Sequence, residues 1–221
     1  MAGNIFVFSG LGADERVFQK LDFSGFSVTF IHWIVPQKSE SIESYAKRLS
    51  QNITGTIPVL IGLSFGGLIA IEVAKQMDVQ KVILIASEKT RSEIPFYFRW
   101  SGQLRLHKLL PINFLKRSNF ISNWFFGAGS EADRVLLKNI LGDTNPAFLK
   151  WAIDKVVNWN NTETIKNVVH IHGTADRILP FCFLKADISV KQGGHLMTFN
   201  KPQELSRILR SLLRNENQPA V

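Results

Sequence analysis

The sequence predicts an α/β protein in which about six mostly parallel strands form one sheet, helices cover both faces, and a helical segment is inserted. Short apolar runs without polar alternation, typical of strands buried on both faces of a sheet, recur along the chain. Segments with helical spacing follow several of these runs, and such alternation favours parallel pairing. This alternation of strands and helices is interrupted over residues 88–160, where the sequence contains no convincing strand.

The first 87 residues contain four of the predicted strands. These are Asn4–Phe8, Phe26–Trp33, Ile57–Leu63 and Lys81–Ser87. Helices are expected from about Glu15 to Leu21, from Ser41 to Asn52 and directly after Ser64. Ser41 is a favourable cap for the second helix, and Glu43 places a negative charge in its first turn, where free backbone amides stabilise it.

The remaining core elements lie toward the C-terminus. Val168–Gly173 and Ile188–Val190 are the predicted fifth and sixth strands, and Pro202 opens a terminal helix over Gln203–Leu213. We therefore assign residues 1–87 and 161–221 to a core and residues 88–160 to an inserted helical cap. The aromatic side chains of the cap should pack mainly in its own interior, with a few facing a pocket. They are Phe96, Tyr97, Phe98, Trp100, Phe114, Phe120, Trp124, Phe125, Phe126, Phe148, Trp151 and Trp159.

One apolar run ends in a motif that indicates chemistry. The third strand continues into Gly62-Leu63-Ser64-Phe65-Gly66, a Gly-x-Ser-x-Gly pattern between a strand and a helix. In a nucleophile elbow of this kind the serine has a strained backbone, and Gly62 and Gly66 let strand and helix approach closely. The amides that begin the helix, that of Phe65 foremost, can stabilise negative charge on a substrate oxygen. The pentapeptide alone also fits an ordinary glycine-containing loop.

Composition narrows the classes of function. The 221 residues are 45% hydrophobic, enough for a sizeable core, and carry a formal net charge of +8. No helix-turn-helix or zinc-ligand spacing accompanies that charge, so nucleic acid is not expected as a partner. The histidines follow no metal-ligand spacing, and we assign neither a metal nor a cofactor. A single cysteine, Cys182, together with the lack of a signal-peptide pattern or membrane-spanning run, predicts a cytoplasmic protein.

Two further motifs follow the last two predicted strands. They are His172-Gly173-Thr174-Ala175-Asp176 and Gly193-Gly194-His195. With the elbow, they make nearly the whole chain resemble a compact member of the α/β-hydrolase superfamily, which has the same order of Ser, Asp and His. The resemblance implies a triad in which Ser64 attacks, His195 carries the proton and Asp176 orients His195. The first two strands of larger members are missing here, which leaves six.

The resemblance also implies an oxyanion hole. Its two donors are the backbone amides of Phe65 and of Leu11, which lies in the glycine-rich loop after the first strand. Many relatives have His-Gly where this chain has Ser9-Gly10. The donor is nevertheless a backbone amide, so it does not depend on the side chain at position 9.

Glu88 is the alternative to Asp176, because some members of the superfamily supply the orienting carboxylate after the strand that here is the fourth. We favour Asp176, which lies in the His-Gly-x-x-Asp context. Glu88 is then expected to begin the cap as a solvated charge.

These motifs predict a serine hydrolase that cleaves a carboxylic ester or a thioester through a covalent acyl-enzyme. The chain resembles small intracellular carboxylesterases, including those that cleave methyl esters of acyl groups held on acyl carrier protein. A thioesterase would use the same residues. The alternative is a non-enzymatic protein of this fold that binds a small ligand or a partner. Such proteins often lose a triad member, whereas all three residues are present here.

Basic residues gather in the cap. Between Ile94 and Ser130 no acidic residue occurs, and the basic ones are Arg99, Arg105, Lys108, Lys116 and Arg117. The ordinary interpretation is a solvated cationic face. Because a cap lies over the mouth of a pocket, the other interpretation is a rim that attracts an acidic acyl carrier protein. That hypothesis assigns Arg99, Arg105 and Lys108 to substrate or partner binding.

Overall fold

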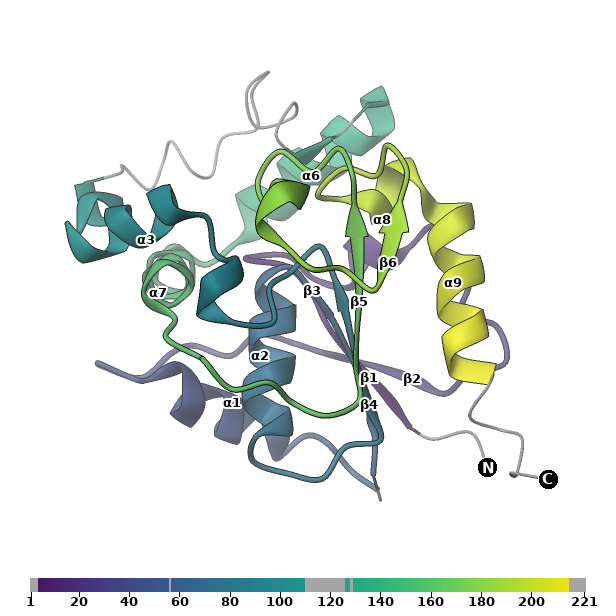
Figure 1. Ribbon diagram of the computed structural model, residues 1–221, viewed down its shortest axis with the longest axis horizontal. Coiled ribbons are helices and arrows are strands. Elements are labelled where there is room, and N and C mark those ends of the chain that lie inside the picture. Colours follow the sequence, from purple (N-terminus) through teal and green to yellow (C-terminus); the bar gives the residue numbers. More distant parts are fainter. Residues whose placement is uncertain (1–3, 56, 110–125, 128, 215–221) are drawn as a thin grey trace.

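The computed structural model describes residues 4–55, 57–109, 126–127 and 129–214, which form one all-parallel sheet with helices on both sides (Figure 1). In this part of the chain, six strands lie in the order β2-β1-β3-β4-β5-β6. They are β1 (Ile5–Phe8), β2 (Val28–Ile31), β3 (Val59–Leu63), β4 (Lys81–Ile85), β5 (Val168–Gly173) and β6 (Ile188–Val190). The predicted α/β class with a parallel sheet is confirmed. The segments that follow the strands consequently meet at one edge of the sheet.

In the described residues, the helices alternate with the strands, and several of them lie between β4 and β5. The α-helices are α1 (Ile42–Ser50), α2 (Phe65–Ala74), α3 (Phe96–Gln103), α6 (Glu131–Asp143), α7 (Pro146–Asn158), α8 (Met197–Asn200) and α9 (Pro202–Arg214). Short 3-10 turns are η1 (Glu15–Phe18), η2 (Arg91–Glu93), η3 (Leu106–Leu109) and η4 (Phe181–Phe183). Figure 1 shows α9, in yellow, on one side of the sheet and α1 and α2 on the other.

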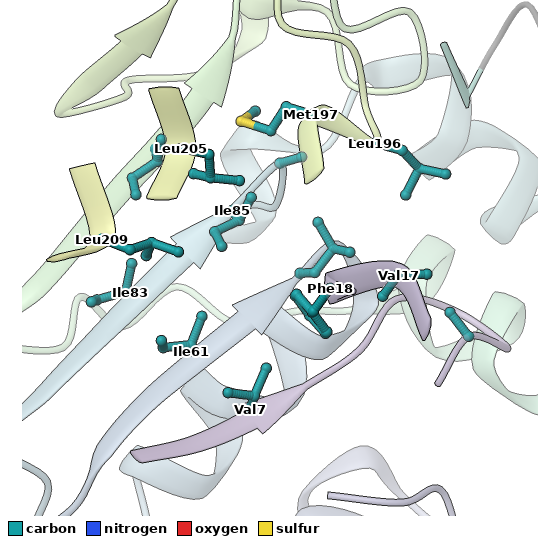
Figure 2. Close-up of a cluster of buried hydrophobic side chains, with 14 of the residues drawn as sticks. Val7, Val17, Phe18, Ile61, Ile83, Ile85, Leu196, Met197, Leu205 and Leu209 are labelled. Carbon is teal, nitrogen blue, oxygen red and sulfur yellow. The ribbon is translucent and has the colours of Figure 1, made fainter. Parts of the chain in front are cut away.

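Alternate residues of each central strand enter two different cores. Ile83 of β4 packs with Leu209 of α9 in the first core, which also includes residues of η1 and α6 (Figure 2). Leu60 of β3 and Val82 of β4 point the other way and pack with residues of α1 and α2. Both faces of the central strands are therefore buried, which explains why their sequences are apolar throughout.

Several predicted elements are shorter than expected. The helix expected from about Glu15 to Leu21 is only the 3-10 turn η1, which the Asp14 side chain caps. The second strand, expected over Phe26–Trp33, covers only β2. The fourth strand ends at Ile85, because Ala86 has a positive φ of 47° and turns the backbone out of the sheet direction.

The aromatic residues between β4 and β5 differ from the expectation of a separate cap interior. Phe148 and Trp151 of α7 pack edge-on against Phe65 of α2, with ring centroids 6.0 and 6.1 Å away. The indole nitrogen of Trp159 donates a 2.8 Å hydrogen bond to Glu72 of α2. These aromatics thus extend the core of the sheet, because α7 lies directly against α2.

Other aromatics of this segment face solvent or fall outside the described residues. Phe96 and Trp100 of α3 are 45% and 60% exposed. Phe114, Phe120, Trp124 and Phe125 lie outside the described residues. The division of the chain into a core and a cap stays a prediction.

Candidate active site

Ser64 occupies a sharp turn between β3 and α2. Its φ of 52° and ψ of −122° lie outside the regions that residues with a side chain normally adopt, as the elbow motif predicts. A Cβ on Gly62 would collide with the backbone of Gly66, and a Cβ on Gly66 would collide with the backbone of Phe8. Glycine at both positions therefore lets β3, α2 and β1 approach closely while the Ser64 side chain stays partly exposed.

His195, which follows β6, connects Ser64 to Asp176, which follows β5. Its Nε2 lies 2.8 Å from Oγ of Ser64, and its Nδ1 lies 2.8 Å from Oδ2 of Asp176. Because an ionised carboxylate only accepts, Nδ1 carries the proton and Nε2 accepts from the serine hydroxyl. Ser64 and His195 are 131 positions apart in the chain, and the parallel sheet brings them together at one edge.

The Asp176 carboxylate is buried, but other residues of the protein form hydrogen bonds with both of its oxygen atoms. Its Oδ1 accepts hydrogen bonds of 2.9 Å from the backbone amides of Ile178 and Leu179. Burial acts to raise the pKa of Asp176, but the charge and hydrogen bond of His195, the Leu179 amide and His172 outweigh it and lower the pKa below 3.8. Asp176 is therefore ionised at neutral pH and can hold the N–H of His195.

Glu88, the alternative acid, does not take part in this line of hydrogen bonds. It is 2% exposed, so the expectation of a solvated charge is wrong. Burial, together with the negative charges of Asp176 and Glu93, raises the pKa of Glu88 to about 8. The sequence placed Glu88 after the fourth strand but did not show that it is buried there, in a cavity wall shared with residues of α3 and α7.

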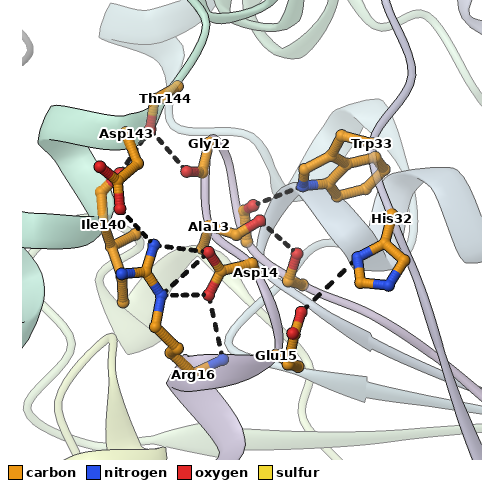
Figure 3. Close-up of polar contacts among 12 residues, drawn as sticks. Gly12, Ala13, Asp14, Glu15, Arg16, His32, Trp33, Ile140, Asp143 and Thr144 are labelled. Atoms are coloured by element: carbon orange, nitrogen blue, oxygen red, sulfur yellow. Dashed lines mark hydrogen bonds and ion pairs between the residues drawn. The ribbon is translucent and has the colours of Figure 1, made fainter.

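The loop after β1 is held by side chains from other elements (Figure 3). The hydroxyl of Thr144, directly after α6, donates a 2.6 Å hydrogen bond to the carbonyl oxygen of Gly12. The indole nitrogen of Trp33 donates one of 3.2 Å to the carbonyl oxygen of Gly10. Arg16 of η1 forms an ion pair with the last residue of α6. These contacts fix the path of the loop that carries Leu11.

Leu11 and Phe65, the predicted oxyanion donors, line the same cavity as Ser64 and His195. The loop passes close to the serine, since a Cβ added to Gly10 would lie 3.8 Å from Cβ of Ser64. Neither the Leu11 nor the Phe65 amide donates a hydrogen bond to another described residue. Within the described residues, both amides are thus available to bind a substrate oxygen, and their role stays a prediction.

A cavity of about 200 Å³ lies beside Ser64. Ser64, His195 and Glu88 are the polar side chains among its described lining residues. The apolar lining residues are Leu11, Phe65, Leu68, Phe98, Phe126, Ile153, Val156, Val157, Ile178 and Leu179. Two aromatics of the predicted cap, Phe98 and Phe126, thus face the cavity. The site consequently suits an apolar substrate group with few polar atoms.

The predicted partner-binding residues lie outside the described cavity wall. Arg99 belongs to α3, and Arg105 and Lys108 lie on the exposed surface at and next to η3. Nζ of Lys108 is 3.9 Å from a carboxylate oxygen of Asp154. Lys116 and Arg117 lie outside the described residues. Binding of a partner by these cations stays a prediction.

His172 has a supporting position that its place in the sequence does not reveal. Its Nε2 lies 2.9 Å from the carbonyl oxygen of Leu179 and 3.3 Å from Oδ2 of Asp176, while its Nδ1 lies 3.2 Å from Nε2 of His170. Burial lowers the pKa of both histidines, that of His170 to about 3, so both are neutral. Alternation along β5 predicts that they share a face, but only the structure shows that this face supports the Asp176 loop.

Two further observations concern the described part of the chain. Within it, no three His, Cys, Asp or Glu side chains are arranged to hold a metal ion. Among its helices, none combines the length and the apolar character that crossing a membrane requires.

The molecule is similar to solved structures, although the sequence itself matches no protein-family model and no curated protein. An esterase from Thermogutta terrifontis, solved with malate bound, has a TM-score of 0.71 at 15% identity, covering 97% of this chain and 90% of that one. An esterase from Exiguobacterium antarcticum has a TM-score of 0.71 at 16% identity, covering 96% and 92%. An N-acyl homoserine lactonase complexed with N-hexanoyl homoserine has a TM-score of 0.70 at 16% identity, covering 100% and 91%. Together with the elbow between β3 and α2 and the six-stranded parallel sheet, these likenesses show that the chain has the α/β-hydrolase fold.

Proposed function

We propose that this protein is a serine hydrolase that cleaves a carboxylic ester or a thioester. The observation that supports this most is the hydrogen-bonded line from Ser64 through His195 to Asp176, with 2.8 Å at each step, at the wall of an apolar cavity. Similar structures that are named esterase or lactonase support the same class of reaction. The fold alone would not, because it also occurs in proteins without catalytic activity.

The geometry suits a two-step acyl transfer. Ser64 Oγ attacks the substrate carbonyl while Nε2 of His195 takes its proton, and Asp176 stabilises the imidazolium that forms. The free amides of Leu11 and Phe65 stabilise the negative oxygen of the tetrahedral intermediate. His195 then donates the proton to the leaving alcohol or thiol, which leaves an acyl group on Ser64. Water, activated by His195, releases the acid and restores the hydroxyl.

The cavity indicates which part of a substrate is held. Its volume of about 200 Å³ and its mostly aliphatic and aromatic wall suit a short acyl or alcohol group rather than a polymer. Ester and thioester differ only in the leaving atom, so the same residues serve both. An acyl group carried by an acidic carrier protein remains part of this proposal, supported by the exposed Arg105 and Lys108.

The alternative is a protein of this fold that binds a ligand in the cavity without turnover. The two uninterrupted hydrogen bonds of His195 weigh against it, because a binding protein has no need to hold a serine hydroxyl, an imidazole and a carboxylate in line.

The first prediction tests the proposed nucleophile. A fluorophosphonate probe should label the wild-type protein, and Ser64→Ala should abolish labelling and lower turnover of p-nitrophenyl esters by several orders of magnitude. Ser24→Ala, which changes an exposed serine outside the cavity wall, is the matched control and should behave as the wild type. A Ser64→Ala protein that keeps half of the esterase activity would contradict the assignment. A wild-type protein that binds esters but neither hydrolyses them nor reacts with the probe would favour the binding protein.

A further inference from the structure

Glu88 is a buried acid in the cavity wall that the proposed mechanism does not use. It is 2% exposed and lines the cavity together with Ser64 and His195. Apart from its own backbone amide, no residue in the described ranges forms a hydrogen bond or an ion pair with its carboxyl group. A buried carboxyl group whose one described hydrogen-bond partner is its own backbone amide is costly, so its presence calls for an explanation.

The other buried glutamates bind other residues, whereas within the described ranges Glu88 has only its own backbone amide. Glu40 forms an ion pair with Arg48 at 2.7 Å. Glu72 accepts a hydrogen bond from the Trp159 indole and forms an ion pair with Lys75, the residue that follows α2. Glu93 accepts hydrogen bonds from two backbone amides. Among these described glutamates, only Glu88 lines the cavity, so a role in binding what occupies the cavity explains its position better than a purely structural role.

Glu88 does not orient His195, because Asp176 already does so. Nδ1 of His195 has one proton to donate, and Oδ2 of Asp176 accepts it at 2.8 Å. Asp176 is held in place by two backbone amides on its other oxygen. His195 therefore has no second Nδ1 proton that Glu88 could accept.

The surroundings of Glu88 favour its neutral form. The charges that act on it are those of Asp176, from the loop after β5, and Glu93, from η2, and His195 shares the cavity wall. Both carboxylates repel a negative charge on Glu88, and burial disfavours it further, so the pKa rises to about 8. At neutral pH the group is a carboxylic acid, which can donate one hydrogen bond.

We propose that Glu88 is a substrate-binding residue whose carboxylic acid donates a hydrogen bond to an oxygen atom within the substrate group that fills the cavity. The preferred substrates are then esters or thioesters whose buried group carries a carbonyl, ether or hydroxyl oxygen rather than a plain alkyl chain. This inference rests on the proposed hydrolase function and adds a substrate class to it. A site that must satisfy a buried donor discriminates against a substrate that lacks the acceptor.

The test compares matched substrates with and without the oxygen. On the acyl side, p-nitrophenyl 4-oxopentanoate and 5-oxohexanoate are paired with the pentanoate and the hexanoate. On the alcohol side, 2-methoxyethyl acetate is paired with butyl acetate. For each pair, the ratio of kcat/KM is measured in the wild type, in Glu88→Gln and in Glu88→Met, so that intrinsic reactivity and any loss of active enzyme cancel between variants.

We expect at least one pair to show a ratio that falls about tenfold in Glu88→Met, since this removes the donor and leaves an apolar side chain. Glu88→Gln should keep most of the preference, because its amide also donates. The pair that responds identifies whether the acyl or the alcohol group occupies the cavity. Above about pH 8 the wild-type ratio should fall as Glu88 ionises, whereas the Glu88→Gln ratio should stay level, because other effects of pH on the enzyme act on both substrates of a pair alike.

Equal ratios in all three proteins, for every pair, would overturn the inference about Glu88 while esterase activity stands. The inference also fails if Glu88→Gln and Glu88→Met lower a ratio equally, because loss of packing would then explain the change. Failure of the hydrolase proposal has a different signature, namely no turnover of any ester and no fluorophosphonate label on Ser64.

Discussion

Two buried carboxyl groups near His195 have opposite ionisation. Asp176 has three hydrogen-bond donors around it and a pKa below its ordinary value, whereas Glu88 has no donor among the described residues beyond its own amide and a pKa raised to about 8. The difference arises from partners, because both groups are nearly fully buried. One group is therefore prepared to stabilise a positive charge, and the other to donate a proton in a hydrogen bond.

This contrast predicts which acid His195 needs. Asp176→Asn should lower kcat/KM for a p-nitrophenyl alkyl ester by roughly 10⁴-fold, because the amide cannot hold the Nδ1 proton or stabilise the imidazolium. Glu88→Gln makes the same chemical change on the neighbouring acid and should cost less than about tenfold with that substrate. Steady-state kinetics of the two variants decide the matter. If Glu88→Gln shows the large loss and Asp176→Asn the small one, the two roles must be exchanged.

The ionisation of Glu88 also predicts how stability depends on pH. The pKa is about 8 in the folded protein and near 4.5 in the unfolded chain, so between these values only the unfolded chain releases the proton. The contribution of Glu88 to stability therefore falls as pH rises, by up to about 1.4 kcal/mol per pH unit. Glu88→Gln removes this dependence and should be stabilised relative to wild type by more at pH 8 than at pH 5. Urea unfolding at both pH values measures this, and an equal difference would contradict a neutral Glu88.

At the level of elements, the junction of β3 with α2 depends on the absence of side chains. Gly62 faces α2, and Gly66 faces the end of β1, each without room for a Cβ. The free energy of unfolding and the position of Ser64 therefore depend on the same contacts, because a side chain at Gly62 or Gly66 that separates the strand from the helix also moves the serine.

Alanine substitution tests this coupling. Gly66→Ala should lower the free energy of unfolding by about 3 kcal/mol or more, because its Cβ meets rigid backbone of β1. Gly142→Ala, in α6, is the matched control, since its Cβ would have no neighbour within 4 Å and alanine favours a helix by about 0.5–1 kcal/mol. Chemical denaturation should rank the proteins Gly142→Ala, wild type, Gly66→Ala. A Gly66→Ala protein as stable as the wild type would contradict the packing.

On the scale of the whole molecule, the net charge of +8 is compatible with either a generally solvated basic surface or an attractive site for an acidic carrier. Arg99, Arg105 and Lys108 lie near exposed aromatic and aliphatic side chains of α3 and η3, including Trp100 at 60% exposure. The positions of these cations fit both interpretations, and the dependence of kcat/KM on salt concentration distinguishes them.

If the cations steer a carrier, reversing Arg99, Arg105 and Lys108 to Glu should depress kcat/KM for acyl groups on acyl carrier protein and spare a neutral p-nitrophenyl ester. Salt should act likewise, because the Debye length shrinks from about 10 Å at 0.1 M to 3 Å at 1 M. The control variant changes three other exposed cations, Lys47, Lys166 and Arg214, to Glu. It has the same change in net charge, but at positions outside the predicted cap. Equal responses of both substrates, or of both triple variants, would remove the carrier and leave a small-molecule esterase.

Several parts of this protein depend on short-range pattern and could be predicted from the amino-acid sequence. Apolar runs without alternation marked the strands, and the spacing in Gly62–Gly66 predicted the strained turn at Ser64, because both signals come from residues adjacent in the chain. The positions of Asp176 and His195 after the last two strands were sufficient to predict that they meet Ser64. Parallel strands end at one edge, so motifs that follow them converge whatever lies between.

Other properties depend on packing between distant segments, and these emerged only from the three-dimensional arrangement. Glu88 was expected to be a solvated charge, but it is buried and shares the cavity wall with Phe98 of α3, Val156 of α7 and Leu179 after β5. The aromatics of α7 were expected in a separate interior, but α7 lies against α2 and adds them to the sheet core. Burial and pKa are properties of a residue's surroundings in space, and those surroundings come from positions that no local pattern connects.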